Sequence, residues 1–104
     1  MSQIFSDDDP HGVYLRLSAQ RALWGNVPRT LRAASVQRQG TRIRCRFIFD
    51  GAASEEDRET VGLVGAEIIS DYPSQFTLDE EFLELQAPGE MTHLEYLVFL
   101  RFEQ

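Results

Sequence analysis

The charged residues of this chain divide it into a basic stretch and an acidic stretch. Residues 10–49 contain no Asp or Glu, whereas residues 50–104 contain fourteen acidic residues against only Arg58 and Arg101. The basic stretch carries eight arginines, which are Arg16, Arg21, Arg29, Arg32, Arg38, Arg42, Arg44 and Arg46. Formal charges of +8 and −12 attract each other. A fold of this chain must therefore bring the two stretches together or present them to charged partners.

Length and composition predict one domain over residues 1–104, with residues 1–8 as a candidate flexible segment. Hydrophobic residues make up 42% of the chain, which excludes a disordered tail. Cys45 is the only cysteine, as is typical of a protein in a reducing cytosol. The acidic N-terminus is unlike a signal peptide, and no apolar run approaches the roughly 18 residues of a membrane span. We expect a soluble, cytoplasmic domain with no membrane partner.

Two segments carry the start and stop signals of α-helices. The first helix is expected over residues 10–24, because an Asp-Pro pair precedes it and Gly25 can end it. The second begins near Ser54, whose hydroxyl can cap the N–H of Asp57, and stops at Tyr72-Pro73. Its buried stripe recurs at helical spacing and consists of Val61, Val64, Gly65, Ile68 and Tyr72.

A β-hairpin is predicted between the two helices. Strands over residues 30–38 and 41–49 flank Gln39-Gly40, which is a typical two-residue turn. Closing the turn in this way would place Cys45 opposite Ala34. In the second strand, apolar residues alternate with arginines, so one sheet face is core. The other face carries an arginine stripe, defined as Arg42, Arg44 and Arg46.

Two further strands are expected after the second helix, over residues 75–86 and from His93 or Leu94 to Glu103. The last strand is apolar on both faces at its centre, which is typical of an interior strand. We therefore predict an α+β domain of order α-β-β-α-β-β. It would hold one four-stranded antiparallel sheet, in the order 1-2-4-3, with both helices on one face. The arginine stripe would then meet Glu95 and Glu103.

Residues suited to catalysis or metal binding are not gathered in recognisable motifs. His11 and His93 each lie at the boundary of a predicted element, and the chain has no lysine to assist them. The run Asp7-Asp8-Asp9 lacks the ligand offsets of a metal loop, and Cys45 lies on the predicted core face. No phosphate loop, Rossmann glycine pattern or zinc spacing is present. We predict no enzyme, no catalytic residue, no metal and no cofactor.

Acidic residues concentrate on the second helix and the third strand. An anionic patch can attract and orient a basic protein, although the same residues could form a solvated surface. A net charge of −7 opposes direct binding to nucleic acid. The predicted partner-binding residues are Asp71, Asp79, Glu80, Glu81 and Glu84, together with Glu55 and Asp57.

Several motifs resemble a family of small bacterial α/β proteins. The run ALWGNVPRTLRA at residues 22–33 is similar to its opening, and VFLRFE at residues 98–103 to its terminal strand. FDG, SEED and EIISDYP, at residues 49–51, 54–57 and 67–73, look like its core. The family includes immunity proteins of contact-dependent growth inhibition systems. The resemblance implies a cytoplasmic antitoxin that binds the C-terminal toxin domain of a delivered effector, often a nuclease. We expect a non-enzymatic inhibitor in a one-to-one complex with a basic toxin domain.

Two alternatives stay open. The chain could be a housekeeping protein-interaction domain with no toxin, including one that forms a homodimer. It could also be a small RNA-binding or RNA-cleaving protein that uses the arginine stripe. Against the RNA alternative, the overall charge is acidic and no aromatic residues are interleaved among these arginines.

Overall fold

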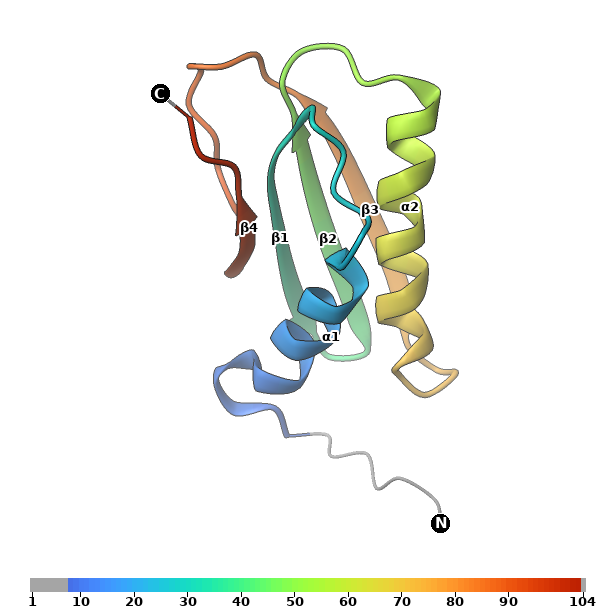
Figure 1. Ribbon diagram of the computed structural model, residues 1–104. Coiled ribbons are helices and arrows are strands. Elements are labelled where there is room, and N and C mark those ends of the chain that lie inside the picture. The colour runs from blue at the N-terminus through green and yellow to red at the C-terminus, as the bar shows by residue number, and fades with distance from the viewer. Residues whose placement is uncertain (1–7, 104) are drawn as a thin grey trace.

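The computed structural model describes residues 8–103, so the predicted flexible segment lies outside the described residues except for Asp8. The predicted order α-β-β-α-β-β is confirmed, with a short 3-10 turn before the first helix (Figure 1). The elements are η1 (Pro10–Gly12), α1 (Val13–Leu23), β1 (Leu31–Gln39), β2 (Arg42–Phe49), α2 (Glu55–Ser70), β3 (Thr77–Glu84) and β4 (Tyr96–Leu100).

The four strands form one mixed sheet in the order β3-β2-β1-β4. The predicted antiparallel sheet of order 1-2-4-3 is therefore wrong, and so is the interior position of the last strand. β2 and β3 are parallel, whereas β1 is antiparallel to both β2 and β4. Parallel neighbours need a long crossover, and α2 provides it with 16 residues, or about 24 Å of helix. Both helices cover the same sheet face, as predicted (Figure 1).

The segment between β3 and β4 crosses the other face of the sheet. The backbone N–H of Leu94 donates to Ser35 Oγ at 2.9 Å, and Arg46 Nη1 donates to the carbonyl of Thr92 at 3.1 Å. Ala33 and Ile48 are fully buried beneath this segment. They are not part of the core cluster on the helix side of the sheet. β3 and β4 therefore occupy opposite edges of the sheet.

The hairpin keeps its predicted faces but not its predicted register. Val36 lies opposite Cys45, so the pairing with Ala34 is wrong by two residues. The turn residues are Gly40 and Thr41 rather than Gln39-Gly40, and Gly40 has a φ of 60°. Glycine tolerates this left-handed conformation, which matches the twist of a two-residue hairpin.

Helix α1 ends where the sequence indicates but begins at Val13, three residues later than predicted, because His11 and Gly12 have left-handed φ values of 63° and 62°. The Asp9 carboxylate accepts the backbone N–H groups of Tyr14 at 2.8 Å and Leu15 at 3.2 Å, which caps the first turn. Gly25 has a φ of 76° and ends the helix. The side that packs on the sheet consists of Leu15, Ala19, Ala22 and Leu23.

Helix α2 confirms its predicted cap and buried stripe. Ser54 Oγ accepts the N–H of Asp57 at 3.0 Å. Val61, Val64, Gly65 and Ile68 are buried, and so is Tyr72 after the helix. This stripe packs on the β2 side chains of Ile43, Cys45, Phe47 and Phe49, which form the centre of the core.

One carboxylate, that of Glu80, reaches into this core face. Glu80 is the partner of Cys45 in the parallel register and lies between Leu78 and Phe82, which pack against the core. Its Oε2 atom is buried and has no hydrogen-bond partner within residues 8–103. Burial therefore raises the pKa of Glu80 above its ordinary value of 4.5. Burial, and secondarily the nearby Glu80, raises the pKa of the Cys45 thiol to about 12.

The two glycines inside α2 should respond oppositely to alanine. A Cβ atom at Gly65 would lie 2.8 Å from Glu80 Cδ, whereas one at Gly62 would have nothing within 4 Å. Gly62→Ala should raise the free energy of unfolding by about 0.5–1 kcal/mol through helix propensity. Gly65→Ala should lower it, because the Glu80 carboxyl must move. Urea denaturation of both variants measures the difference, and equal effects would contradict this packing.

Replacing Glu80 should remove one pH-dependent loss of stability. The folded chain holds the pKa of Glu80 above its unfolded value, so the protonated form favours folding. The free energy of unfolding therefore falls as pH rises from about 4.5 through the raised pKa. Glu80→Gln has no carboxyl group to titrate at this position. Its free energy of unfolding, relative to that of wild type, should therefore increase over this pH range. Urea unfolding at a series of pH values tests this, and parallel pH profiles would refute it.

Candidate functional site

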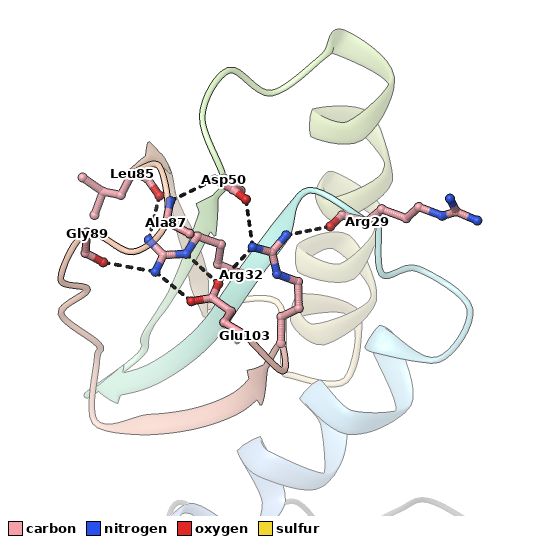
Figure 2. Close-up of polar contacts among 8 residues, drawn as sticks. Arg29, Arg32, Asp50, Leu85, Ala87, Gly89 and Glu103 are labelled. Atoms are coloured by element: carbon pink, nitrogen blue, oxygen red, sulfur yellow. Dashed lines mark hydrogen bonds and ion pairs between the residues drawn. The ribbon is translucent and has the colours of Figure 1, made fainter.

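An ion network around the buried Arg32 joins the start of β1 to Glu103, after β4 (Figure 2). The Arg32 side chain is only 2% exposed. Its Nε and Nη2 atoms donate to the two carboxylate oxygens of Glu103, at 2.7 and 2.9 Å. Its Nη1 atom donates to the carbonyl of Leu85 at 2.7 Å, and Nη2 also donates to that of Gly89 at 3.1 Å. One guanidinium thus connects three segments that are distant in sequence.

A second arginine and a second carboxylate complete this network. Arg101 Nη2 donates to Asp50 Oδ2 at 2.9 Å and to Glu103 Oε2 at 3.0 Å, and the N–H of Ala87 donates to Asp50 Oδ1 at 2.9 Å. The hydrogen bonds from Arg32 and Arg101 lower the pKa of Glu103. Those from Arg101 and Ala87 lower the pKa of Asp50. Two positive and two negative charges balance, so the network is structural and leaves no net charge for a partner.

The arginine stripe is paired with β3, which lies beside β2. Arg42 forms an ion pair with Asp79, while Arg44 and Arg46 both reach Glu81 at 3.2 Å. The predicted pairing of the stripe with Glu95 and Glu103 is therefore wrong. The prediction failed because of the sheet order, since β3 rather than β4 is the neighbour of β2.

Several predicted partner-binding residues are thus held by contacts within the domain. Asp79 and Glu81 balance the arginine stripe, and Glu80 lies against the core. Asp71 Oδ2 accepts hydrogen bonds from Ser18 Oγ at 2.6 Å and Arg21 Nη2 at 2.9 Å, which joins the end of α2 to α1.

The remaining three predicted residues differ in their surroundings. Glu84 accepts hydrogen bonds from the N–H of Ala53 and from Arg58, both at 2.9 Å, and its pKa is lowered by these contacts. Asp57 accepts the hydroxyl of Thr30 at 2.6 Å. Glu55 is exposed and has no ion pair within residues 8–103. Of the seven predicted residues, Glu55 is therefore the one whose charge is most available to a partner.

The outward side of α2 collects several of the acidic residues that the fold leaves without an ion pair. We call it the acidic face, defined as Glu55, Glu56, Glu59 and Glu67 around the exposed Leu63. These positions recur at spacings of three and four residues, on the side of the helix opposite the buried stripe. None of the four glutamates has an ion pair among the described residues.

The acidic face has the physical properties of a surface for a basic protein. Glu55 and Glu56 lie in the first turn of α2, where the helix dipole favours negative charge. Leu63, at its centre, gives an apolar contact that is 57% exposed. The seven partner-binding residues predicted from the sequence do not include Glu56, Glu59 or Glu67, which lie on this face. Their helical spacing, combined with the buried stripe, is the signal that could have identified them.

The described residues offer little for other chemistry. Residues 8–103 contain no group of three or more His, Cys, Asp or Glu side chains that could hold a metal ion. Neither α1 nor α2 is long and apolar enough to cross a membrane. His11 and His93 are exposed, and Cys45 is buried.

Comparison with known protein families gives one match that spans the fold. The family model of the MafI2 immunity protein matches residues 13–103. The match begins with α1 and ends at Glu103, so it includes both helices, all four strands and the buried ion network. No curated protein matches the chain.

Arg32 should be among the residues least tolerant of substitution. Arg32→Met removes four hydrogen bonds and should lower the free energy of unfolding by about 3 kcal/mol, as expected for a broken buried ion pair. Arg32→Lys should have a smaller effect. It keeps the positive charge but lacks the planar guanidinium that binds both carboxylate oxygens of Glu103. Chemical denaturation measures both. Arg29→Met, at an exposed position, is the control, and equal effects at the two positions would contradict the network's role.

Proposed function

This chain belongs to the MafI2 immunity protein family, and we propose from that membership that it binds a cognate toxin and neutralises it. The immunity-protein family indicated by the sequence motifs is thereby confirmed. We further propose that the toxin is a basic nuclease domain delivered as in contact-dependent growth inhibition. In this proposal the inhibitor acts in the cytoplasm in a one-to-one complex and carries out no catalysis itself.

The acidic face of α2 is the proposed toxin-binding surface. The observation that supports it is the unequal use of acidic residues within the fold. Carboxylates on β3 balance arginines, whereas the four glutamates of α2 have no ion pair within residues 8–103. A patch of uncompensated negative charge on a rigid helix attracts a cationic surface and fixes its orientation. A nuclease domain suits this surface, because groups that bind phosphates are cationic and would meet carboxylates here.

The RNA-binding alternative has less support. It needs a cationic surface, but each arginine of the stripe forms an ion pair with Asp79 or Glu81. Arg46 also donates to the Thr92 carbonyl and hydroxyl, which holds it against the segment between β3 and β4. A phosphate would have to compete with these carboxylates.

Charge reversal on the acidic face tests the proposed surface. Glu59→Arg should slow association with the cognate toxin domain by about tenfold, because it removes electrostatic steering. Glu59→Arg combined with Glu67→Arg should slow association further and abolish growth rescue on co-expression with the toxin. Surface plasmon resonance gives the rates, and the difference from wild type should shrink at high salt.

The matched control is Glu90→Arg, which changes the net charge equally at an exposed position between β3 and β4. It should leave association and growth rescue close to wild type. If Glu90→Arg and Glu59→Arg weaken binding equally, only the net charge matters and the acidic face is not the binding surface. Wild-type protein that neither binds nor rescues would refute the proposed function itself.

A further inference from the structure

A single tryptophan lies exposed at the end of α1. Trp24 is the only tryptophan of the chain, and its side chain is 85% exposed. It is the C-cap residue of α1, and Gly25 turns the chain directly after it. Tryptophan is among the side chains most enriched at the energetic centres of interfaces, because its large rigid ring loses little conformational entropy when it is covered. Whether an exposed tryptophan binds a partner depends on what surrounds it.

Hydrogen bonds attach the chain on both sides of Trp24 to α2. Before it, Arg21 Nη2 donates to Asp71 Oδ2 at 2.9 Å, at the end of α2. After it, Thr30 Oγ1 donates to Asp57 Oδ2 at 2.6 Å, in the first turn of α2. The end of α1 and the loop after it therefore pass beside α2 (Figure 1).

The side of α2 that faces this segment belongs to the acidic face. Arg21 and Ala22 of α1 line one pocket together with Glu67. Leu63 lies one turn before Glu67, and Glu56 lies two turns before Leu63, so the three share this side of the helix. The other side of α2 faces β3. Trp24 and the acidic face are therefore parts of one continuous surface.

This surface has an apolar centre within negative charge. Val27, in the loop after Trp24, is 40% exposed, and Leu63 is 57% exposed. The glutamates of the acidic face have no ion pair among residues 8–103, and the nearest cation, Arg21, is balanced by Asp71. An indole ring attracts a cation to its face, and a carboxylate accepts the hydrogen bonds of that cation. The surface is therefore complementary to a cation with an apolar stem.

We propose that Trp24 and Glu67 together bind one arginine side chain of the cognate toxin, which makes Trp24 the central contact of the interface. The proposal rests on the proposed function, since the toxin supplies the arginine. The planar guanidinium would stack on the indole of Trp24 and donate to the carboxylate of Glu67, while its methylene groups would cover Leu63. Such a contact forms only in the docked complex, so it slows dissociation, whereas the charge of the acidic face speeds association.

Fluorine NMR of the full chain, labelled with fluorinated tryptophan, tests whether the toxin covers Trp24. The labelled chain gives one resonance because Trp24 is its only tryptophan, and the unlabelled toxin gives none. Adding the cognate toxin domain should shift this resonance. A complex that forms with the resonance unchanged would overturn the proposal and leave the proposed function intact. A resonance that shifts when the chain alone is concentrated would also overturn it, because a second copy would then cover Trp24.

Substitutions of Trp24 test the chemistry of the contact. Trp24→Ala should speed dissociation of the toxin domain by about tenfold or more in surface plasmon resonance. Phe102→Ala is the matched control, because Phe102 is 86% exposed but lies after β4, and it should dissociate as wild type does. Trp24→Phe should have a smaller effect than Trp24→Leu, because phenylalanine keeps an aromatic face for the cation. Equal effects of Trp24→Phe and Trp24→Leu would mean that the occupant is apolar and would contradict the arginine.

A double-mutant cycle tests whether Trp24 and Glu67 bind the same side chain. The effects of Trp24→Ala and Glu67→Gln on affinity should be less than additive, because each removes a contact with one arginine. Glu55→Gln, on a different side of α2, is the control, and its effect should add to that of Trp24→Ala. Additive effects at Glu67 would contradict the shared arginine. Urea unfolding confirms that each variant is folded, and a wild-type chain that does not bind the toxin would refute the proposed function and this proposal with it.

Discussion

One buried guanidinium joins three segments of the fold that are distant in sequence. Arg32 lies at the start of β1 and binds Glu103 near the end of the chain, as well as the Leu85 and Gly89 carbonyls after β3. These contacts hold the segment that crosses the second sheet face, and that segment brings β4 to the edge beside β1. A buried cation is tolerated here because a carboxylate and two carbonyls accept its protons. Backbone pairing with β1 and the hydrogen bond from Gln20 to the Val98 carbonyl also hold β4 at this edge.

The charge division of the sequence is resolved by the parallel pairing of β2 and β3. The arginine stripe and the acidic residues of β3 become neighbours, and their charges cancel on a shared sheet face. What the fold cannot cancel is the acidic face of α2, because its glutamates point away from the sheet. The proposed toxin-binding surface is therefore what the internal ion pairs leave exposed. It consists of the charges that the structure does not need for its own stability.

Local signals in the sequence predicted the helices, the order of the elements and the faces of the hairpin. The Ser54 cap and the α2 stripe depend on neighbours within a few turns, so they could be predicted from spacing. The position of β4 could not, because an exposed apolar edge has the same pattern as an interior strand. The sequence did hold a clue that β3 is the neighbour of β2: Asp79 and Glu81 alternate at the spacing of the arginine stripe. Nothing local distinguished Arg32 from the other arginines, since its acceptors lie more than fifty residues away.

The proposed toxin-binding surface favours one kind of interaction. A charged helix face gives fast, oriented encounter with a cationic partner, and its contribution weakens as salt increases. The arginine stripe cannot provide the same effect for an anionic partner, because Asp79 and Glu81 already neutralise it within the sheet. The parallel pairing of β2 and β3 therefore decides the sign of the charge that the domain offers to a partner.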